Sequence, residues 1–443
     1  MSRVITVIIL LVFPRILFAQ EVKLPEGLGD LATMTQTEDS GPGLPFDLSG
    51  FVESRIGTRL QRDAHEKDTS IGEMRLQIGI EKDFEALTVN FVTDFIYDPV
   101  LNNHTIDLET GQGFADIREA NVVFSPFDFM DVKIGRQVLT WGTGDLVFIN
   151  DLFPKDWNSF FIGRDNEYLK GPSDALKAAV FFGDYNLDIV YTPRFDSDRF
   201  IDGRRISFFD RGLGALRGRE NPVVANRPDR WFQDDELALR LYRSFGAYET
   251  ALYYYNGFWK SPAGVDLNNG QVTFPKLQVF GASVRGPVIK GIGSAEVGYY
   301  KSADGAASNP LIKNGEFRLL LGYEQEIATE LTASVQYYLE RKLDYGQYLA
   351  SLPPGAIRDS KNRHIFTLRL RKLLMNQDMT VGLFNFYSPT DRDGYLRVNI
   401  SYKISDSLTV SAGGNIFYGS RISSFFGQLK DNSNIFTALH YDF

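Results

Sequence analysis

The sequence predicts an all-β fold, a transmembrane antiparallel up-and-down β-barrel of about eighteen strands with short periplasmic turns and long extracellular loops. Three observations predict it. Apolar and polar side chains alternate with a period of two over most of the chain, short and long connections follow one another in turn, and the last amphipathic segment ends on an aromatic residue.

Composition limits the possible classes of protein. The chain has 443 residues, a formal net charge of -9, no cysteine and 14% aromatic residues. The acidic balance argues against nucleic-acid binding, which favours a basic excess. The absence of cysteine excludes disulfides, thiolate metal sites and a thiol nucleophile.

The N-terminus reads as an export signal. Arg3 precedes a short apolar stretch, residues 4–13, and Ala19 provides a small residue for cleavage. The alternative, an uncleaved anchor helix, is disfavoured because the apolar run is too short to cross a bilayer. We therefore expect a signal peptide at 1–19, a periplasmic lead-in at 20–45 and the barrel at 46–443.

Alternation defines the predicted strands. In residues 396–404, for example, Leu396, Val398 and Ile400 fall on one face, and Arg397 and Asn399 fall on the other. Eighteen segments follow this pattern: 48–60, 70–82, 86–97, 114–124, 131–141, 175–183, 186–195, 235–244, 247–258, 275–286, 291–301, 315–325, 330–341, 362–374, 378–388, 393–404, 407–419 and 434–443. Arg118, Glu119 and Arg136 fit neither face well.

The connections indicate which way the apolar face points. Links after even-numbered segments are short, and links after odd-numbered segments are usually long. Such sorting is typical of outer-membrane barrels, whereas both ends of a soluble sandwich or propeller meet the same solvent. In hydrocarbon every backbone polar group needs an internal partner, so the sheet must close. The apolar face then meets lipid and the polar face encloses water.

Two sets of residues support a membrane barrel. In the last segment Ile435, Leu439, Tyr441 and Phe443 share one face, a pattern that resembles the C-terminal signal read by the barrel-assembly machinery. Trp141, Trp231 and Trp259 lie where segments meet long loops, so we expect them in the aromatic girdle at the lipid interface. Outer-membrane lipid, lipopolysaccharide and the assembly machinery are the expected partners.

One stretch resembles a known family. Residues 115–145 contain ADIREANVVF followed by VKIGRQVLTWGTGD, and they are similar to the alginate-export-type porins and their porin-like relatives. The matching positions are Glu119, Ala120, Gly135, Arg136, Gln137, Trp141 and Gly142, while Asn121 replaces the usual aromatic residue. The resemblance implies an eighteen-strand pore of the Gram-negative outer membrane, with an acidic polysaccharide as one substrate.

A barrel of eighteen strands is wide enough for a water-filled channel, so its selectivity for solutes would come from the loops that narrow it. Residues 142–174 carry several acids, including Asp145, and residues 194–230 are rich in arginine. We expect the second loop to fold into the lumen and, with Arg136, to favour anions, because guanidinium groups attract them at a constriction. The loop arginines are Arg194, Arg199, Arg204, Arg205, Arg211, Arg217, Arg219, Arg227 and Arg230. Pairing of these arginines with nearby acids or with lipopolysaccharide phosphates is the alternative.

The strands also carry charged side chains on their polar face, among them Glu53, Arg55, Glu73 and Arg75. We interpret these charges as a wall in which opposite charges compensate one another.

The predicted function is a passive channel for hydrophilic, anion-leaning solutes. The alternative is a structural or partner-docking barrel of an export or efflux assembly, whose loops fill the pore and which meets periplasmic export partners. An enzyme is not expected: the four histidines, His65, His104, His364 and His440, show no metal-binding spacing, and no GxSxG or P-loop motif occurs. A rim-active site with His364 or His440 and Ser360 is the weakest alternative. No cofactor or metal is predicted.

Overall fold

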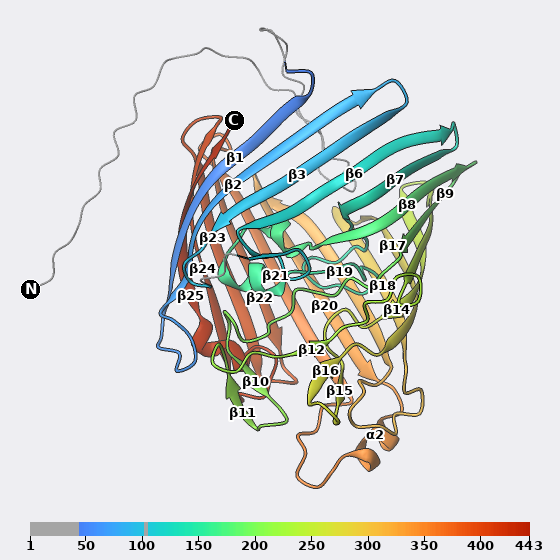
Figure 1. Cartoon of the computed structure of the whole chain (residues 1–443), viewed down its shortest axis with the longest axis vertical. Helices are drawn as coiled ribbons and strands as arrows, with labels where there is room; N and C mark the ends of the chain where they lie inside the picture. The colour runs from blue at the N-terminus through green and yellow to red at the C-terminus, as the bar shows by residue number, and fades with distance from the viewer. Residues whose placement is uncertain (1–43, 102–104) are drawn as a thin grey trace, which may run out of the picture. The chain divides into compact units, whose positions relative to one another are not determined.

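A single antiparallel sheet closes into a barrel. The structure, a computed structural model, describes residues 44–101 and 105–443. Eighteen strands form the wall, and the ring is closed because the first strand pairs with both the second and the last (Figure 1). This confirms the predicted fold class. The predicted signal peptide and the lead-in up to residue 43 lie outside the described residues.

The wall strands match the predicted segments one for one. They are β1 (Asp47–Arg59), β2 (Thr69–Phe84), β3 (Leu87–Tyr97), β6 (Ala115–Phe127), β7 (Met130–Val138), β8 (Pro172–Phe182), β9 (Tyr185–Thr192), β13 (Glu236–Phe245), β14 (Tyr248–Phe258), β17 (Lys276–Val288), β18 (Gly291–Ser302), β19 (Glu316–Ala328), β20 (Leu331–Lys342), β21 (Asn362–Leu374), β22 (Met379–Ser388), β23 (Asp393–Lys403), β24 (Leu408–Gly419) and β25 (Asn434–Asp442).

The remaining elements belong to the long connections. They are β4 (Ile106–Asp107), β5 (Gln112–Gly113), α1 (Trp157–Ile162), the 3-10 turn η1 (Asn166–Leu169), β10 (Phe208–Asp210), β11 (Ala215–Arg217), β12 (Ala225–Asn226), β15 (Gly264–Asp266), β16 (Gln271–Thr273), α2 (Tyr345–Ser351) and the 3-10 turn η2 (Gly427–Asn432). Of the described helices, none has the length and apolar character needed to cross a membrane.

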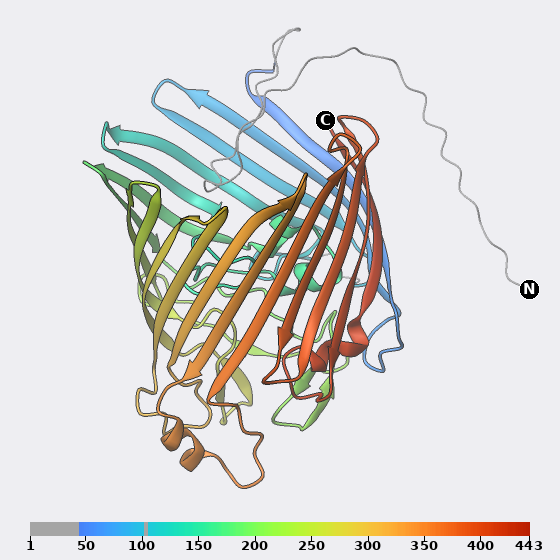
Figure 2. The same cartoon turned by 180° about the vertical axis from the view of Figure 1, so that it is seen from behind.

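Turns and loops are sorted to opposite ends of the barrel, as predicted. Figure 2 shows tight hairpins at the upper end and the long connections at the lower end. Two of the hairpins, at residues 183–184 and 246–247, have a glycine with φ of +60° at the first central position. This suits type II′ turns, whose twist matches that of the flanking strands.

The two faces of the wall have opposite character. On β1 the inward-facing Glu53 and Arg55 are 4% and 2% exposed, whereas the outward-facing Val52 and Ile56 are 39% and 63% exposed. On β25 the outward-facing Ile435, Leu439 and Tyr441 are likewise exposed, and the inward-facing Asn434 is buried. A water-soluble protein buries its apolar face, so the wall of this barrel has the reverse arrangement.

A β-bulge explains the irregular fourth segment. The register between β3 and β6 shifts at Val92 and Thr93, so Arg118 is an extra residue in β6. Arg118 and Glu119 therefore both face the interior, which strict alternation forbids. Arg118 lies over the ring of Tyr168 at 5.0 Å, and Glu119 accepts a hydrogen bond from Lys133 at 2.9 Å.

Candidate functional site: two loops inside the barrel

The loop between β7 and β8, residues 139–171, crosses the barrel interior. On one side the backbone N–H groups of Thr143 and Asn150 donate to the Glu296 carboxylate of β18 at 2.9 and 2.7 Å. On the other side Arg55 of β1 donates to the carbonyl of Gly163 at 2.5 Å. Since β1 and β18 are ten places apart one way round the ring of eighteen strands and eight places apart the other way, the loop spans the lumen from wall to wall.

A short helix anchors the far end of this loop. The Asp156 side chain caps α1 by accepting from the Ser159 N–H at 2.7 Å. The helix ends at Gly163, whose φ is +95°, and a side chain there would fall 2.3 Å from the Phe436 ring. Phe161 packs edge-on against Tyr395 and Phe417, at centroid distances of 5.5 and 5.2 Å. Aromatic packing therefore fixes the loop against β23 and β24.

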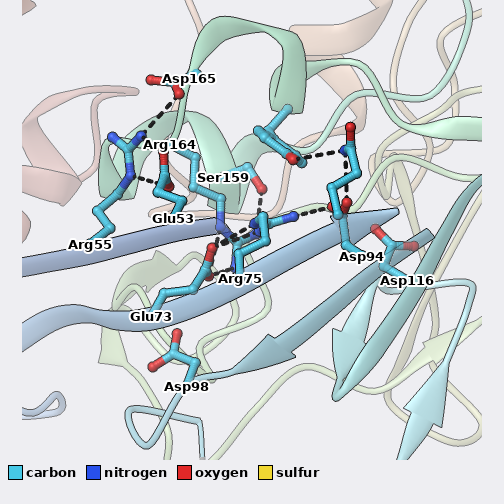
Figure 3. A network of polar contacts seen from close by, with 12 residues as sticks. Glu53, Arg55, Glu73, Arg75, Asp94, Asp98, Asp116, Ser159, Arg164 and Asp165 are labelled. Carbon is cyan, nitrogen blue, oxygen red and sulfur yellow. Dashed lines mark hydrogen bonds and ion pairs between the residues drawn. The ribbon is translucent and has the colours of Figure 1, made fainter. Parts of the chain in front are cut away.

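A buried charge network holds the same loop to the first strands (Figure 3). The carboxylate of Glu73 on β2 accepts from Arg164 of the loop at 2.5 Å and from Arg75 at 2.7 Å. Arg55 pairs with Glu53 at 2.7 Å and with Asp165 of the loop at 3.0 Å. These pairs confirm the predicted compensation of strand charges.

The network continues towards β3. Arg75 also pairs with Asp94, and its guanidinium lies over the Tyr168 ring of η1 at 4.1 Å. A buried charge is tolerated only when partners neutralise it. The loop therefore keeps its position only while these ion pairs are intact. The side chain of Glu73 is completely buried.

The second loop, residues 193–235, packs against the first. Arg199 makes a two-pronged ion pair with Asp116 of β6, at 2.7 Å for each bond, and its backbone carbonyl accepts from the Trp157 N–H at 3.2 Å. Arg205 donates to the Ser70 carbonyl at 3.1 Å and pairs with Asp98. Residues 199–207 therefore line the inner rim of β2, β3 and β6.

Eight of the nine predicted loop arginines form ion pairs in the structure. The pairs are Arg194–Glu109, Arg199–Asp116, Arg204–Asp202, Arg205–Asp98, Arg211–Asp359, Arg217–Asp210, Arg219–Glu66 and Arg230–Asp234. Arg227 lies over the ring of Phe200 at 5.9 Å. The positive charge of the loop is thus compensated by nearby acids, and the exposed members are Arg204, Arg211 and Arg230.

The other two predicted pore residues lie near the start of the first loop, Arg136 on β7 and Asp145 within the loop. Arg136 donates to the carbonyls of Ile117 and Leu108 at 2.7 and 2.6 Å and pairs with Asp174 at 3.2 Å. Asp145 accepts from Arg369 of β21 at 2.9 Å. Both side chains therefore also hold the connection between β7 and β8 in place.

Two of the three predicted girdle tryptophans lie inside. Trp259 is 6% exposed, stacks on Tyr300 at 5.6 Å and donates to Ser302 at 3.1 Å. Trp141 packs on Phe153 at 4.8 Å. The prediction of a lipid interface is wrong for both, because the loops they belong to turn inward rather than outward. Trp231 is 53% exposed.

The histidines are dispersed. His364 bonds to the Tyr337 hydroxyl at 2.9 Å, His440 lies 3.4 Å from Glu53, and His65 pairs with Glu220 at 2.6 Å. His104 lies outside the described residues. Within residues 44–101 and 105–443, acidic and histidine side chains gather nowhere in a group able to hold a metal ion.

One buried carboxyl of the second loop makes stability depend on pH. Asp196 accepts from Ser173 at 2.7 Å and from the Asp174 N–H at 2.9 Å, and Lys260 donates to its carbonyl at 2.9 Å. Burial, opposed by these hydrogen bonds and by the charge of Lys260, raises the pKa of Asp196 to about 7.

At pH values between the ordinary pKa of an aspartate and about 7, the Asp196 carboxyl is therefore protonated in the folded chain and ionised in the unfolded chain. We expect the unfolding temperature in detergent to fall as the pH rises from 5 to 8, and Asp196→Asn to flatten that slope. Asp229→Asn, at an exposed position of the same loop, is the control. An unchanged slope in Asp196→Asn contradicts the assignment.

The fold has counterparts among solved structures. The chain is similar to OccK11 (OpdR) of Pseudomonas aeruginosa, with 8% identity, 89% of this chain and 95% of that chain covered, and a TM-score of 0.53. It is also similar to OccK5 (OpdH) of the same organism, with 9% identity, 89% and 97% coverage and a TM-score of 0.52. At such low identity the likeness establishes a shared barrel architecture.

Comparisons of sequence return nothing. No family model matches the chain, and no curated protein matches it. The resemblance to alginate-export-type porins therefore stays a prediction.

Proposed function

We propose that the protein is a channel of the Gram-negative outer membrane through which hydrophilic solutes pass without an energy source. The observation that carries the proposal is the closed sheet with an apolar outer face and a charged inner face. An apolar surface around a whole barrel is stable in hydrocarbon and not in water. The short turns then face the periplasm and the long loops face outward.

The two inward loops set the width of the path. Eighteen strands enclose enough space for water, so what crosses the lumen decides which solutes pass. Residues 139–171 are bonded to β1, β2, β18 and β21, and residues 199–207 fill the space near β3 and β6. Solutes can therefore pass only through the part of the lumen that these segments leave open.

A second function is favoured by the apolar cluster inside the barrel. Ile149, Phe160 and Phe161 of the first loop belong to one buried cluster with residues of fourteen wall strands, among them Val190, Leu320 and Phe417. Such packing is typical of a protein core rather than of a water-filled pore. It supports a barrel whose loops fill the lumen, serving as a docking member of an export or efflux assembly with periplasmic partners.

Single-channel recording in planar bilayers separates the two functions. We expect stable conductance steps from the purified full chain, smaller than an unobstructed eighteen-strand barrel would give. Steps that appear only after loop residues are removed would show a filled barrel. A protein that stays in the soluble fraction without detergent would contradict both functions.

The finer proposal is a preference for anions, including an acidic polysaccharide. It rests on the guanidinium groups of Arg204, Arg211 and Arg230, which are ion-paired but remain exposed, whereas the buried arginines are neutralised locally by their partners. We expect the reversal potential in a salt gradient to indicate anion preference. The triple change of these residues to glutamine should reduce that preference.

Arg421→Gln is the matched control, because Arg421 is an exposed arginine of a different long loop. A cation preference that none of these changes alters removes the anion proposal. Three further proposals rest on the sequence alone. They are contacts with lipopolysaccharide, cleavage of the signal peptide, and recognition by the assembly machinery of Ile435, Leu439, Tyr441 and Phe443.

A further inference from the structure

A groove of about 560 Å³ lies on the outer face of the barrel, over β13, β14, β17 and β18. The strand register explains the hollow. Leu252 lies beside Ala282, and Val284 lies beside Ala295, so two small side chains alternate with two large ones on the outward face. The lining is mainly apolar, as a surface for an acyl chain requires.

A charged pair closes the end of this groove at the rim that carries the short turns. Arg243, two residues before the end of β13, bonds through Nη2 to Asp184 in the β8–β9 turn at 3.1 Å. Its guanidinium lies over the rings of Tyr185 and Phe245 at 4.6 and 4.2 Å. The Nε–H of Arg243 is buried, and no residue of the described chain accepts a hydrogen bond from it.

We propose that this groove binds one acyl chain of a glycerophospholipid whose headgroup carries a primary ammonium. The lipid phosphate would lie on Arg243, and the ammonium on Asp184, whose side chain is 78% exposed. The inference rests on the proposed membrane location and is independent of conduction.

Charge complementarity selects this headgroup. Arginine presents several donors to phosphate, and the buried Nε–H is a donor without a partner. The neighbouring carboxylate repels a net anionic headgroup and accepts hydrogen bonds from a primary ammonium, which a trimethylammonium group cannot donate. Because lipid tails are as apolar as leucine, the groove by itself discriminates little, and the headgroup contacts set the preference.

A second copy of the chain fits the surface less well. An interface over the groove would cover Arg243 and Asp184 and remove both charges from water, which is costly for a pair with few other hydrogen bonds. A zwitterionic headgroup instead supplies a partner for each charge.

Native mass spectrometry of the delipidated full chain in detergent tests the proposal. Phosphatidylethanolamine, phosphatidylcholine and phosphatidylglycerol with identical acyl chains are added at equal concentrations. We expect phosphatidylethanolamine to be retained about tenfold more than the other two, and Arg243→Gln to remove most of that retention. Asp184→Asn should abolish the preference over phosphatidylcholine, and Ala282→Phe should reduce retention of all three lipids.

Lys82→Gln is the matched control. Lys82 also lies two residues before the end of its strand and over a terminal phenylalanine ring, Phe84, at 5.9 Å, but far from the groove lining. Equal retention of the three lipids, or the same loss in Lys82→Gln as in Arg243→Gln, overturns the proposal. A dimer that Ala282→Phe disrupts would also overturn it, in favour of a second copy. If the unmodified chain shows no lipid preference but conducts normally, that result counts against this inference alone and not against the channel.

Discussion

Glu73→Gln should lower the free energy of unfolding in detergent by about 3–5 kcal/mol, the cost of removing one partner of a buried ion pair. Glu73 is completely buried and accepts hydrogen bonds from both Arg75 and Arg164. Glutamine retains the volume and removes the charge, which leaves two guanidinium groups with insufficient compensation. The midpoint of urea or heat unfolding, followed by the mobility shift of the folded barrel, measures the loss.

Glu81→Gln is the control for this change, because Glu81 lies on the inward face of the same strand and is only partly buried. The double variant with Arg164→Gln should recover part of the stability, since it removes one of the two uncompensated cations. A loss below about 1 kcal/mol in Glu73→Gln, similar to that of Glu81→Gln, would mean that water compensates the arginines.

The wall of this barrel could be predicted from the sequence because its signal is local. Alternation places successive side chains on opposite faces, so each strand is marked by its own residues. The segment predicted at 362–374 is β21 at the same residues. The segment predicted at 131–141 ends three residues late, because Leu139 and Trp141 continue the apolar pattern into the inward loop.

The arrangement of the loops could not be predicted because it depends on contacts between distant residues. Asp165 meets Arg55 across 110 positions, and Arg369 meets Asp145 across 224. Composition indicated that residues 194–230 carry arginines, but it did not indicate which carboxylates lie beside them. Glu296 illustrates the limit: it falls within the predicted segment 291–301, and nothing in the sequence marks it as the partner of Thr143 and Asn150.

Replacing residues 139–171 with a short glycine-serine turn should raise single-channel conductance several-fold. The two ends of the loop are adjacent, because Val138 pairs with Pro172 across β7 and β8, so a tight connection joins them without strain on the wall. The replacement removes α1, η1 and the contacts to β1, β18 and β21 at once. With those segments gone, more of the enclosed cross-section becomes accessible to ions.

The outcome also decides between the two proposed functions. A rise from a measurable conductance to a larger one supports a channel that the loop narrows, whereas a rise from none supports a barrel that the loop fills. A single change at the anchor, Glu296→Gln, keeps the loop but weakens its hold by removing the charge that three donors share, on Thr143 and Asn150. It should give intermittent openings rather than a constant increase. Unchanged conductance in the loop replacement, with the barrel still folded by its mobility shift, would mean that residues 139–171 do not control passage.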